Sequence, residues 1–204
     1  QLTSHVKHVR DFNQLPIPFV CIATDIETGQ QEVLNNGFLP QALLASSAFP
    51  SLFSPVEMNG KILIDGGVTN NYPIDEVRKM GADFIIGVDV QDGLKDRNYL
   101  KEATKILLQI SNLQVISSMK DKIAATDIYI KPEISQFTIV SFEKGKEIIK
   151  KGEDATQPFL EQLKNLSKKQ NSLFVKPNLK TTDSLTIDRI TINDQKNYTR
   201  AYVI

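Results

Sequence analysis

Short runs of apolar and β-branched residues alternate along this polypeptide with segments whose apolar residues recur at helical spacing. Runs of the first kind predict strands, and they occupy residues 18–26, 61–64, 83–90 and 126–132. Segments of the second kind predict helices at residues 38–49, 73–81, 100–116 and 142–166. Strands that alternate with helices in this way indicate an α/β domain with a largely parallel sheet.

Several of these segments carry further signals. Residues 31–37 are expected to form a hairpin with the strand at 18–26. The near-continuous apolar run at 83–90 is typical of a parallel strand that is covered on both faces. We expect the last helix to be interrupted near Gly152 and to start again near Pro158.

A polar stretch at residues 167–184 marks the end of this α/β domain. The β-rich residues 185–192 follow it, and the remaining tail is too short to bury a core of its own. We therefore interpret residues 1–180 as one domain and residues 181–204 as a linker and the truncated start of a following domain.

Charge and cysteine content exclude several classes of protein. The 24 basic and 24 acidic residues cancel, so nothing in the overall charge points to nucleic acid or to an anionic membrane surface. No apolar stretch reaches the roughly 18 to 20 residues that a membrane-spanning helix needs. The single cysteine, Cys21, excludes an internal disulfide, and its place in an apolar run favours a buried, unreactive thiol.

Asp65 directly follows the predicted strand and precedes two glycines, Gly66 and Gly67. In a parallel α/β sheet, functional groups cluster at the carboxyl ends of strands, where helix N termini present free N–H groups. The glycines lack side chains, so the backbone can turn sharply and another segment or a substrate can approach the carboxylate. Two roles remain open for Asp65 on this pattern: a catalytic carboxylate, and a turn cap that accepts backbone N–H groups.

Other polar residues are weaker candidates. Asp25 and Asp89 also end apolar runs, but neither is followed by paired glycines, so we interpret both as turn caps. His5 and His8 are the only histidines, and their spacing would place both on one helix face as metal ligands. No cysteine or paired carboxylate is spaced to complete such a site, which favours two solvent-exposed histidines instead.

The sequence has no G-x-S-x-G nucleophile elbow, because no two of its glycines lie four residues apart. It also has no P-loop and no dinucleotide-binding fingerprint, so no cofactor is predicted. Ser46 and Ser47 follow a predicted helix and precede Pro50. We interpret these serines as helix-end residues and not as nucleophiles.

Residues 16–30 (PIPFVCIATDIETGQ) and 42–90, in which D-G-G is followed by N-N-Y-P, resemble the second half of the catalytic domain of patatin-like phospholipases. That family is similar to the cytosolic phospholipase A2 lipases in using a serine and an aspartate without a histidine. The resemblance implies the C-terminal part of a three-layer α/β/α domain and a lipid or other ester as substrate. It also implies that Asp65 is the base of a Ser-Asp dyad, supported by Gly66 and Gly67.

The sequence departs from the family pattern in one respect. The glycine-rich oxyanion loop and the nucleophile elbow precede the D-G-G motif in this family, and neither occurs among these residues. We therefore expect a fragment of a lipid acyl hydrolase that is inactive alone and whose missing partner is the N-terminal half of the catalytic domain. Such a fragment should expose an apolar sheet edge and helix face.

Two other functions remain open on the sequence. In the first, the patatin-like scaffold has lost its chemistry and serves as a binding or structural module beside an outer-membrane protein. In the second, Asp65 and Asp89 belong to a phosphate- or metal-binding α/β domain.

The tail carries a separate resemblance. Residues 187–204 (IDRITINDQKNYTRAYVI) are similar to the opening of a POTRA domain, the small module that precedes outer-membrane β-barrels. This resemblance implies a bacterial protein exported to the outer membrane or cell surface of a Gram-negative bacterium, with a membrane-embedded barrel downstream. The alternatives are an ordinary C-terminal strand and a cytoplasmic protein.

Overall fold

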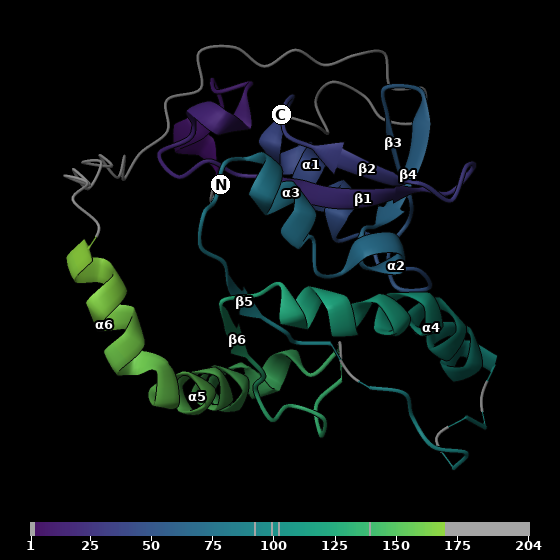
Figure 1. Ribbon diagram of the computed structural model, residues 1–204. Coiled ribbons are helices and arrows are strands. Elements are labelled where there is room, and N and C mark those ends of the chain that lie inside the picture. The colour runs from purple at the N-terminus through teal and green to yellow at the C-terminus, as the bar shows by residue number, and fades with distance from the viewer. Residues whose placement is uncertain (1–2, 92, 99, 102, 139, 170–204) are drawn as a thin grey trace. The chain divides into compact units, whose positions relative to one another are not determined.

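The computed structural model describes residues 3–91, 93–98, 100–101, 103–138 and 140–169, all within the first of two units of the polypeptide, Gln1–Phe174. These residues form a mixed α/β fold, which confirms the predicted α/β class (Figure 1). The expected domain boundary near residue 180 and the POTRA-like segment lie outside the described residues.

Four strands form an antiparallel sheet in the order β2-β1-β4-β3. The strands are β1 (Cys21–Asp25), β2 (Gln31–Leu34), β3 (Val56–Met58) and β4 (Lys61–Asp65). The pairing of β1 with β2 confirms the predicted hairpin. Strands β3 and β4 are joined by Asn59 and Gly60, whose φ angles of 54° and 75° match the right-handed twist of a two-residue hairpin. Connections this short allow only antiparallel pairing.

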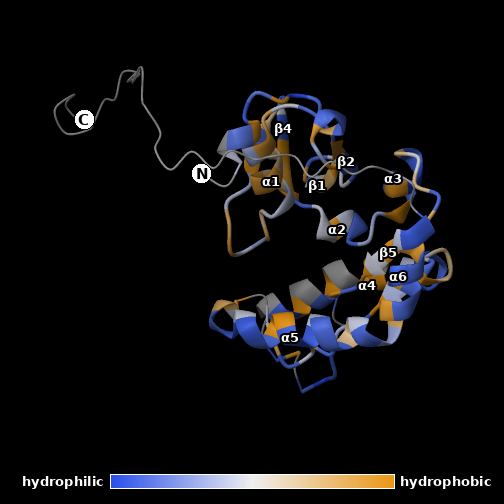
Figure 2. Cartoon of the chain, turned by 90° about the vertical axis from the view of Figure 1, so that its left-hand side faces the viewer, coloured by the Kyte–Doolittle hydropathy of each residue, from blue (hydrophilic) through white to orange (hydrophobic). Residues whose placement is uncertain are grey.

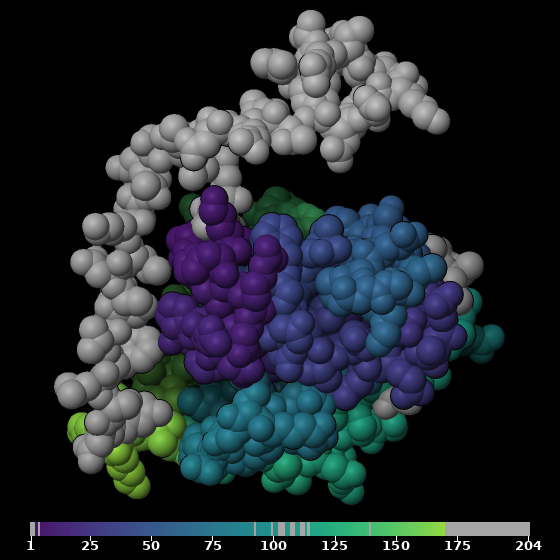
Figure 3. Space-filling model, turned by 90° about the horizontal axis from the view of Figure 1, so that it is seen from above, coloured from purple at the N-terminus to yellow at the C-terminus, as the bar shows by residue number. Residues whose placement is uncertain are grey.

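Helix α1 (Leu39–Ser46) follows β2 and begins with Pro40 in its first turn, where a missing N–H is tolerated. Its buried Ala42 and Ala45 share a hydrophobic core with Leu63 of β4. Phe12, in the second of two short 3-10 turns (Ser4–Val6 and Phe12–Gln14), is fully buried in the same core. Figure 3 shows the N-terminal residues, in purple, packed beside the blue surface of the residues that follow them.

The residues after β4 build a second core. Helices α2 (Gly67–Asn70) and α3 (Ile74–Lys79) lead to β5 (Ile86–Val88), and the long helix α4 (Ala103–Ala124) precedes β6 (Ile128–Ile130). The core is formed by Tyr72, Ile74, Ile85 and Met119. Strands β5 and β6 pair in parallel, as expected for strands joined through a helix. Among the described strands, parallel pairing is confined to this pair, so the expectation of a largely parallel sheet is wrong for these residues. Short hairpin connections make the larger sheet antiparallel.

The prediction that the strand at 83–90 is covered on both faces is wrong for the described residues. Side chains at alternate positions share one face of a strand. On one face Ile85 is buried, whereas on the other Ile86 is 47% exposed, Val88 52% and Val90 63%. A continuous apolar run shows that both faces are apolar, and it does not show that both are packed.

Two helices close the described part of the polypeptide. After a 3-10 turn (Phe142–Lys144), helix α5 (Gly145–Thr156) continues through Gly152, so the interruption expected there is wrong. The break falls instead in the 3-10 turn Gln157–Phe159, where Pro158 lacks an N–H, and α6 (Leu160–Lys169) follows. Glycine weakens a helix by only about 1 kcal/mol, which neighbouring residues can offset. None of the helices in the described residues is long and apolar enough to cross a bilayer.

Candidate functional site

Asp65 is the last residue of β4, and its carboxylate is only partly accessible to solvent. Its backbone N–H donates to the Ala48 carbonyl at 3.0 Å, and its Oδ1 accepts the N–H of Gly67 at 2.6 Å. Burial raises the pKa of the Asp65 carboxyl above its ordinary value, and the Gly67 hydrogen bond offsets part of this rise. Among the described residues, no hydrogen-bond donor reaches Oδ2. Asp65 is thus a turn cap through one oxygen, while the other oxygen is free to take a proton.

The two glycines are required because there is no room for a Cβ at either position. The backbone angles do not require them, since Gly66 has an ordinary helical φ of −68°. A Cβ on Gly66 would lie 2.1 Å from the Ile22 carbonyl oxygen of the neighbouring strand β1. A Cβ on Gly67 would lie 2.9 Å from Asp65 Oδ1. The first glycine therefore lets the turn after β4 pass against β1, and the second lets the N–H of residue 67 reach the carboxylate.

A pair of hydroxyl groups ties this turn to the sheet. Thr24 of β1 donates from Oγ1 to the backbone carbonyl of Asp65 at 2.9 Å, and its Oγ1 lies 3.0 Å from Oγ1 of Thr69 in α2. The sequence reasoning missed both threonines. The available signal was a threonine inside the apolar run of β1, where a buried hydroxyl needs a hydrogen-bond partner.

Helix α2 lies between β1 and α4 (Figure 1). At its end, Lys122 of α4 donates to Asn70 Oδ1 at 2.6 Å, and Asn70 donates to Gln31 Oε1 at 2.8 Å. Burial lowers the pKa of Lys122, and the nearby carboxylate of Asp75 raises it in part. The short helix after Asp65 is therefore fixed from the sheet on one side and from α4 on the other.

The structure does not bring the other two strand-end aspartates to Asp65. Because β1 and β4 are antiparallel, Asp25 ends its strand at the opposite end from Asp65, where it accepts from the Glu27 N–H and the Thr28 hydroxyl. Asp25 is thus a turn cap, as predicted.

Asp89 follows β5, which belongs to the two-stranded sheet. Its carboxylate accepts from the Gln91 N–H at 2.8 Å, from Tyr129 Oη at 2.5 Å and from Lys131 Nζ at 3.0 Å. Burial alone would raise the pKa of Asp89, but these donors hold it below its ordinary value. Asp89 therefore caps a turn, as predicted, and also joins β5 to the residues that end β6.

The histidines and serines lie where the sequence suggested. His5 and His8 are exposed, and no group of three metal-ligating side chains occurs in the part of the protein that the structure describes. Ser46 ends α1, and Ser47 donates from Oγ to the Leu43 carbonyl at 2.8 Å, so both are helix-end residues. Cys21 is half-buried and not fully buried as expected. Burial still raises the pKa of its thiol, and a hydrogen bond with Ser46 offsets part of the rise, which fits an unreactive cysteine.

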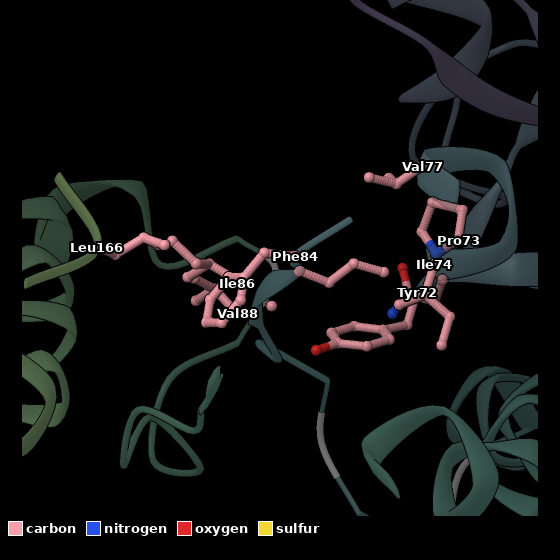
Figure 4. A pocket seen from close by; sticks show the side chains of 11 residues that line it. Tyr72, Pro73, Ile74, Val77, Phe84, Ile86, Val88 and Leu166 are labelled. Carbon is pink, nitrogen blue, oxygen red and sulfur yellow. The ribbon is translucent and has the colours of Figure 1, made fainter. Parts of the chain in front are cut away.

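An open apolar pocket of about 480 Å³ lies between the residues around α3 and the strand β5. Figure 4 shows Tyr72, Pro73 and Ile74 on one side and Phe84, Ile86 and Val88 on the other, with Leu166 at the far end. Asp65 does not line this pocket. Its apolar wall is the uncovered face of β5.

Comparison with known proteins relates this site to lipid hydrolases. Residues 9–78, which include the D-G-G motif and its strand, match the family model of patatin-like phospholipases. Lysophospholipase NTE1 of Candida glabrata is 28% identical over 72% of this chain, and that of Saccharomyces cerevisiae is 26% identical over 72%. An uncharacterized NTE family protein of Mycobacterium tuberculosis is 36% identical over 38% of this chain and 21% of its own length. These matches support a relationship between this polypeptide and the patatin-like phospholipase family.

The 204 residues cover only part of these relatives. The 204 residues span 10% of the length of both of these yeast lysophospholipases.

Proposed function

We propose that this polypeptide is part of a lipid acyl hydrolase in which Asp65 is the base of a Ser-Asp dyad. The observation that carries the proposal is the partly buried carboxylate at the end of β4, with one oxygen bound to the Gly67 N–H and the other free. The family match over residues 9–78 and the lysophospholipase relatives support an ester of a lipid as the substrate class.

In the proposed reaction, a serine upstream of these residues attacks the carbonyl carbon of the ester. Its hydroxyl proton passes to Oδ2 of Asp65, and the new oxyanion is stabilised by N–H groups of a glycine-rich loop, also upstream. Collapse of the tetrahedral intermediate expels the alcohol, which takes the proton from Asp65 and leaves an acyl-serine. Water then attacks the acyl group by the same route, and Asp65 again accepts and returns the proton.

A raised pKa suits Asp65 for this role. A carboxylate at the ordinary value of about 3.9 is a weak base toward a serine hydroxyl. Partial burial makes Asp65 a stronger base than an exposed aspartate. The free oxygen, Oδ2, can accept the proton while Oδ1 keeps its hydrogen bond with the Gly67 N–H.

The nucleophile and oxyanion loop are proposed to belong to an N-terminal half of the catalytic domain that packs against these residues. The uncovered face of β5 supports this, because Ile86, Val88 and Val90 form an exposed apolar row. Figure 2 shows hydrophobic residues in orange on β5 and the adjoining segments. On this proposal the 204 residues alone are inactive, since a base without a nucleophile forms no acyl-enzyme.

We also propose, from the sequence resemblance, that residues 181–204 begin a POTRA-like domain and that the whole protein reaches the outer membrane of a Gram-negative bacterium. Immunodetection of the whole protein in separated cytoplasmic and outer-membrane fractions tests this. Recovery in the cytoplasmic fraction alone would favour the cytoplasmic alternative.

The competing function is an inactive patatin-like binding or structural module. The presence or absence of a G-x-S-x-G motif upstream of these residues distinguishes it from the first function. The two functions differ in one measurable property: the module has no nucleophile that reacts with a fluorophosphonate probe.

Replacement of the base tests the proposal directly. In the full-length protein, Asp65→Asn should lower kcat for hydrolysis of a lysophospholipid about 10²- to 10⁴-fold, because a neutral amide cannot accept the serine proton. The measurement is release of fatty acid, together with fluorophosphonate labelling, which replacement of the upstream serine should abolish.

The matched control is Asp25→Asn, which alters the turn-capping aspartate of the neighbouring strand. It should leave kcat within a few-fold of the wild-type value. Hydrolysis at the wild-type rate by the Asp65→Asn protein would remove Asp65 from the mechanism.

A further inference from the structure

Three contacts fix Asp65 in place. Its backbone N–H donates to the Ala48 carbonyl, its backbone carbonyl accepts the Thr24 hydroxyl, and its Oδ1 accepts the Gly67 N–H. The first two contacts set the position of the Cα atom, and the third sets the direction of the carboxylate. Of these contacts, only the one from Thr24 depends on the identity of a side chain outside Asp65.

The Thr24 hydroxyl has a defined hydrogen-bond direction. It has one proton, and the Asp65 carbonyl can only accept, so Thr24 donates to that carbonyl at 2.9 Å. Thr69 Oγ1 lies 3.0 Å from Thr24 Oγ1 and 3.4 Å from the Gly66 carbonyl, so its one proton is shared between these two acceptors. The result is a hydrogen-bonded path from α2 through β1 back to the backbone of Asp65, which joins the two ends of the D-G-G turn.

Thr24 is 2% exposed, so it cannot touch a substrate. Its backbone is already paired with Ile64 of β4 and Gln31 of β2, so the sheet does not need the hydroxyl. The hydroxyl is a buried polar group placed where β1 passes the turn, and its contacts are the Asp65 carbonyl and Thr69.

We propose that Thr24 and Thr69 are positioning residues that hold the Asp65 carboxylate in the orientation from which Oδ2 accepts the serine proton. This inference rests on the proposed function of Asp65. Neither threonine takes part in the bond changes, because Thr24 contacts the backbone of Asp65 and not its carboxylate. Both act only on the geometry of proton transfer, where misplacement of a reacting group by about 1 Å can cost 10²-fold in rate.

The test compares four threonine variants of the full-length protein. Thr24→Val keeps the shape of the side chain and removes the hydroxyl, Thr24→Ser keeps the hydroxyl, and Thr69→Val removes the second hydroxyl. Thr28→Val is the matched control, since it removes a threonine hydroxyl that binds a carboxylate, Asp25 Oδ2, elsewhere on the same hairpin. We measure kcat and KM for lysophospholipid hydrolysis.

Thr24→Val should lower kcat about tenfold or more with KM unchanged, because the loss concerns proton transfer and not substrate binding. Thr24→Ser should restore most of the loss, Thr69→Val should give a smaller loss, and Thr28→Val should give none. A Thr24→Val protein with wild-type kcat would overturn the inference.

A double-substitution cycle separates positioning from a general structural role. In an Asp65→Asn background, Thr24→Val should cause no further loss of kcat, because the base whose orientation it controls is already absent. An equal loss in both backgrounds would overturn the inference. If Asp65→Asn itself retains wild-type turnover, the proposed function fails, whereas loss in Asp65→Asn with none in Thr24→Val refutes only the positioning role.

Discussion

Two aspartates in similar places along the sequence have opposite electrostatic environments. Asp65 and Asp89 each follow an apolar strand, and each accepts the N–H of the residue two positions later. Asp65 has no further donor among the described residues, so burial dominates and its pKa rises. Asp89 also meets Tyr129 and Lys131, which favour the charged form and lower its pKa. Such separation of pKa values by environment distinguishes a candidate base from a structural carboxylate.

The opposite pKa directions predict opposite effects on stability. The pKa of Asp65 is higher in the folded state than in the unfolded state. Its contribution to the free energy of unfolding is therefore fully present below the ordinary aspartate pKa and is lost as pH rises through the folded-state pKa. Asp65→Asn stays neutral, so it should raise the free energy of unfolding at pH 7, and the gain should vanish near pH 3. Urea unfolding of the 204-residue polypeptide at both pH values measures this.

Asp89→Asn is the matched variant with the reverse sign. The lowered pKa of Asp89 gives stability that is present above the ordinary aspartate pKa and is lost as pH falls through the folded value. Asp89→Asn should therefore destabilise the protein at pH 7 by about 1 to 3 kcal/mol, with the difference shrinking in acid. A destabilised Asp65→Asn protein at pH 7 would contradict our account of the Asp65 environment.

At the scale of elements, the D-G-G turn depends on how closely β1 and the start of α2 approach each other. A side chain on Gly66 would meet the backbone of Ile22, which is held by the sheet. By contrast, Gly152 lies inside α5 with no atom within 4 Å of a would-be Cβ.

Alanine at these two glycines should therefore have opposite effects. Gly66→Ala should destabilise the protein by about 1 to 3 kcal/mol or more, because the backbone must move to relieve the overlap. Gly152→Ala should stabilise it by about 0.5 to 1 kcal/mol, since alanine favours helix and restricts the unfolded state. Thermal unfolding of both variants measures the difference, and a neutral Gly66→Ala would show that the turn is looser than described.

At the scale of the whole molecule, the two strands of the parallel pair differ in exposure. Ile86 of β5 and Ile128 of β6 are opposite each other in register, yet Ile86 is 47% exposed and Ile128 is 1% exposed. The proposed N-terminal half of the catalytic domain would cover Ile86 and leave Ile128 as it is.

This difference gives a test for the covering half. Ile86→Thr should change the free energy of unfolding of the 204-residue polypeptide by no more than about 0.5 kcal/mol, because the side chain is half exposed to solvent. In the full-length protein it should destabilise by about 1 to 3 kcal/mol, since the hydroxyl is then buried without a partner. Ile128→Thr should destabilise both forms, and an equal, small effect of Ile86→Thr in both would show that this face stays open.

Much of the local structure was predictable from short-range pattern. The hairpin of β1 with β2, the strand that ends at Asp65, and the helices after Phe38 and Pro73 all follow from apolar runs bounded by proline and glycine. One local signal was overlooked: Asn59-Gly60 between two short strands predicts the β3–β4 hairpin.

The sequence by itself determined the order of strands and helices and the place of a carboxylate beside two glycines, because these depend on neighbouring residues. Only the tertiary structure decided that one apolar face of β5 stays uncovered. It decided that residue 66 must be glycine, because a Cβ there would overlap the Ile22 backbone. It also decided that Thr24 binds the backbone of Asp65, forty-one residues away. Burial and contact join residues distant in sequence, and no local pattern encodes which ones meet.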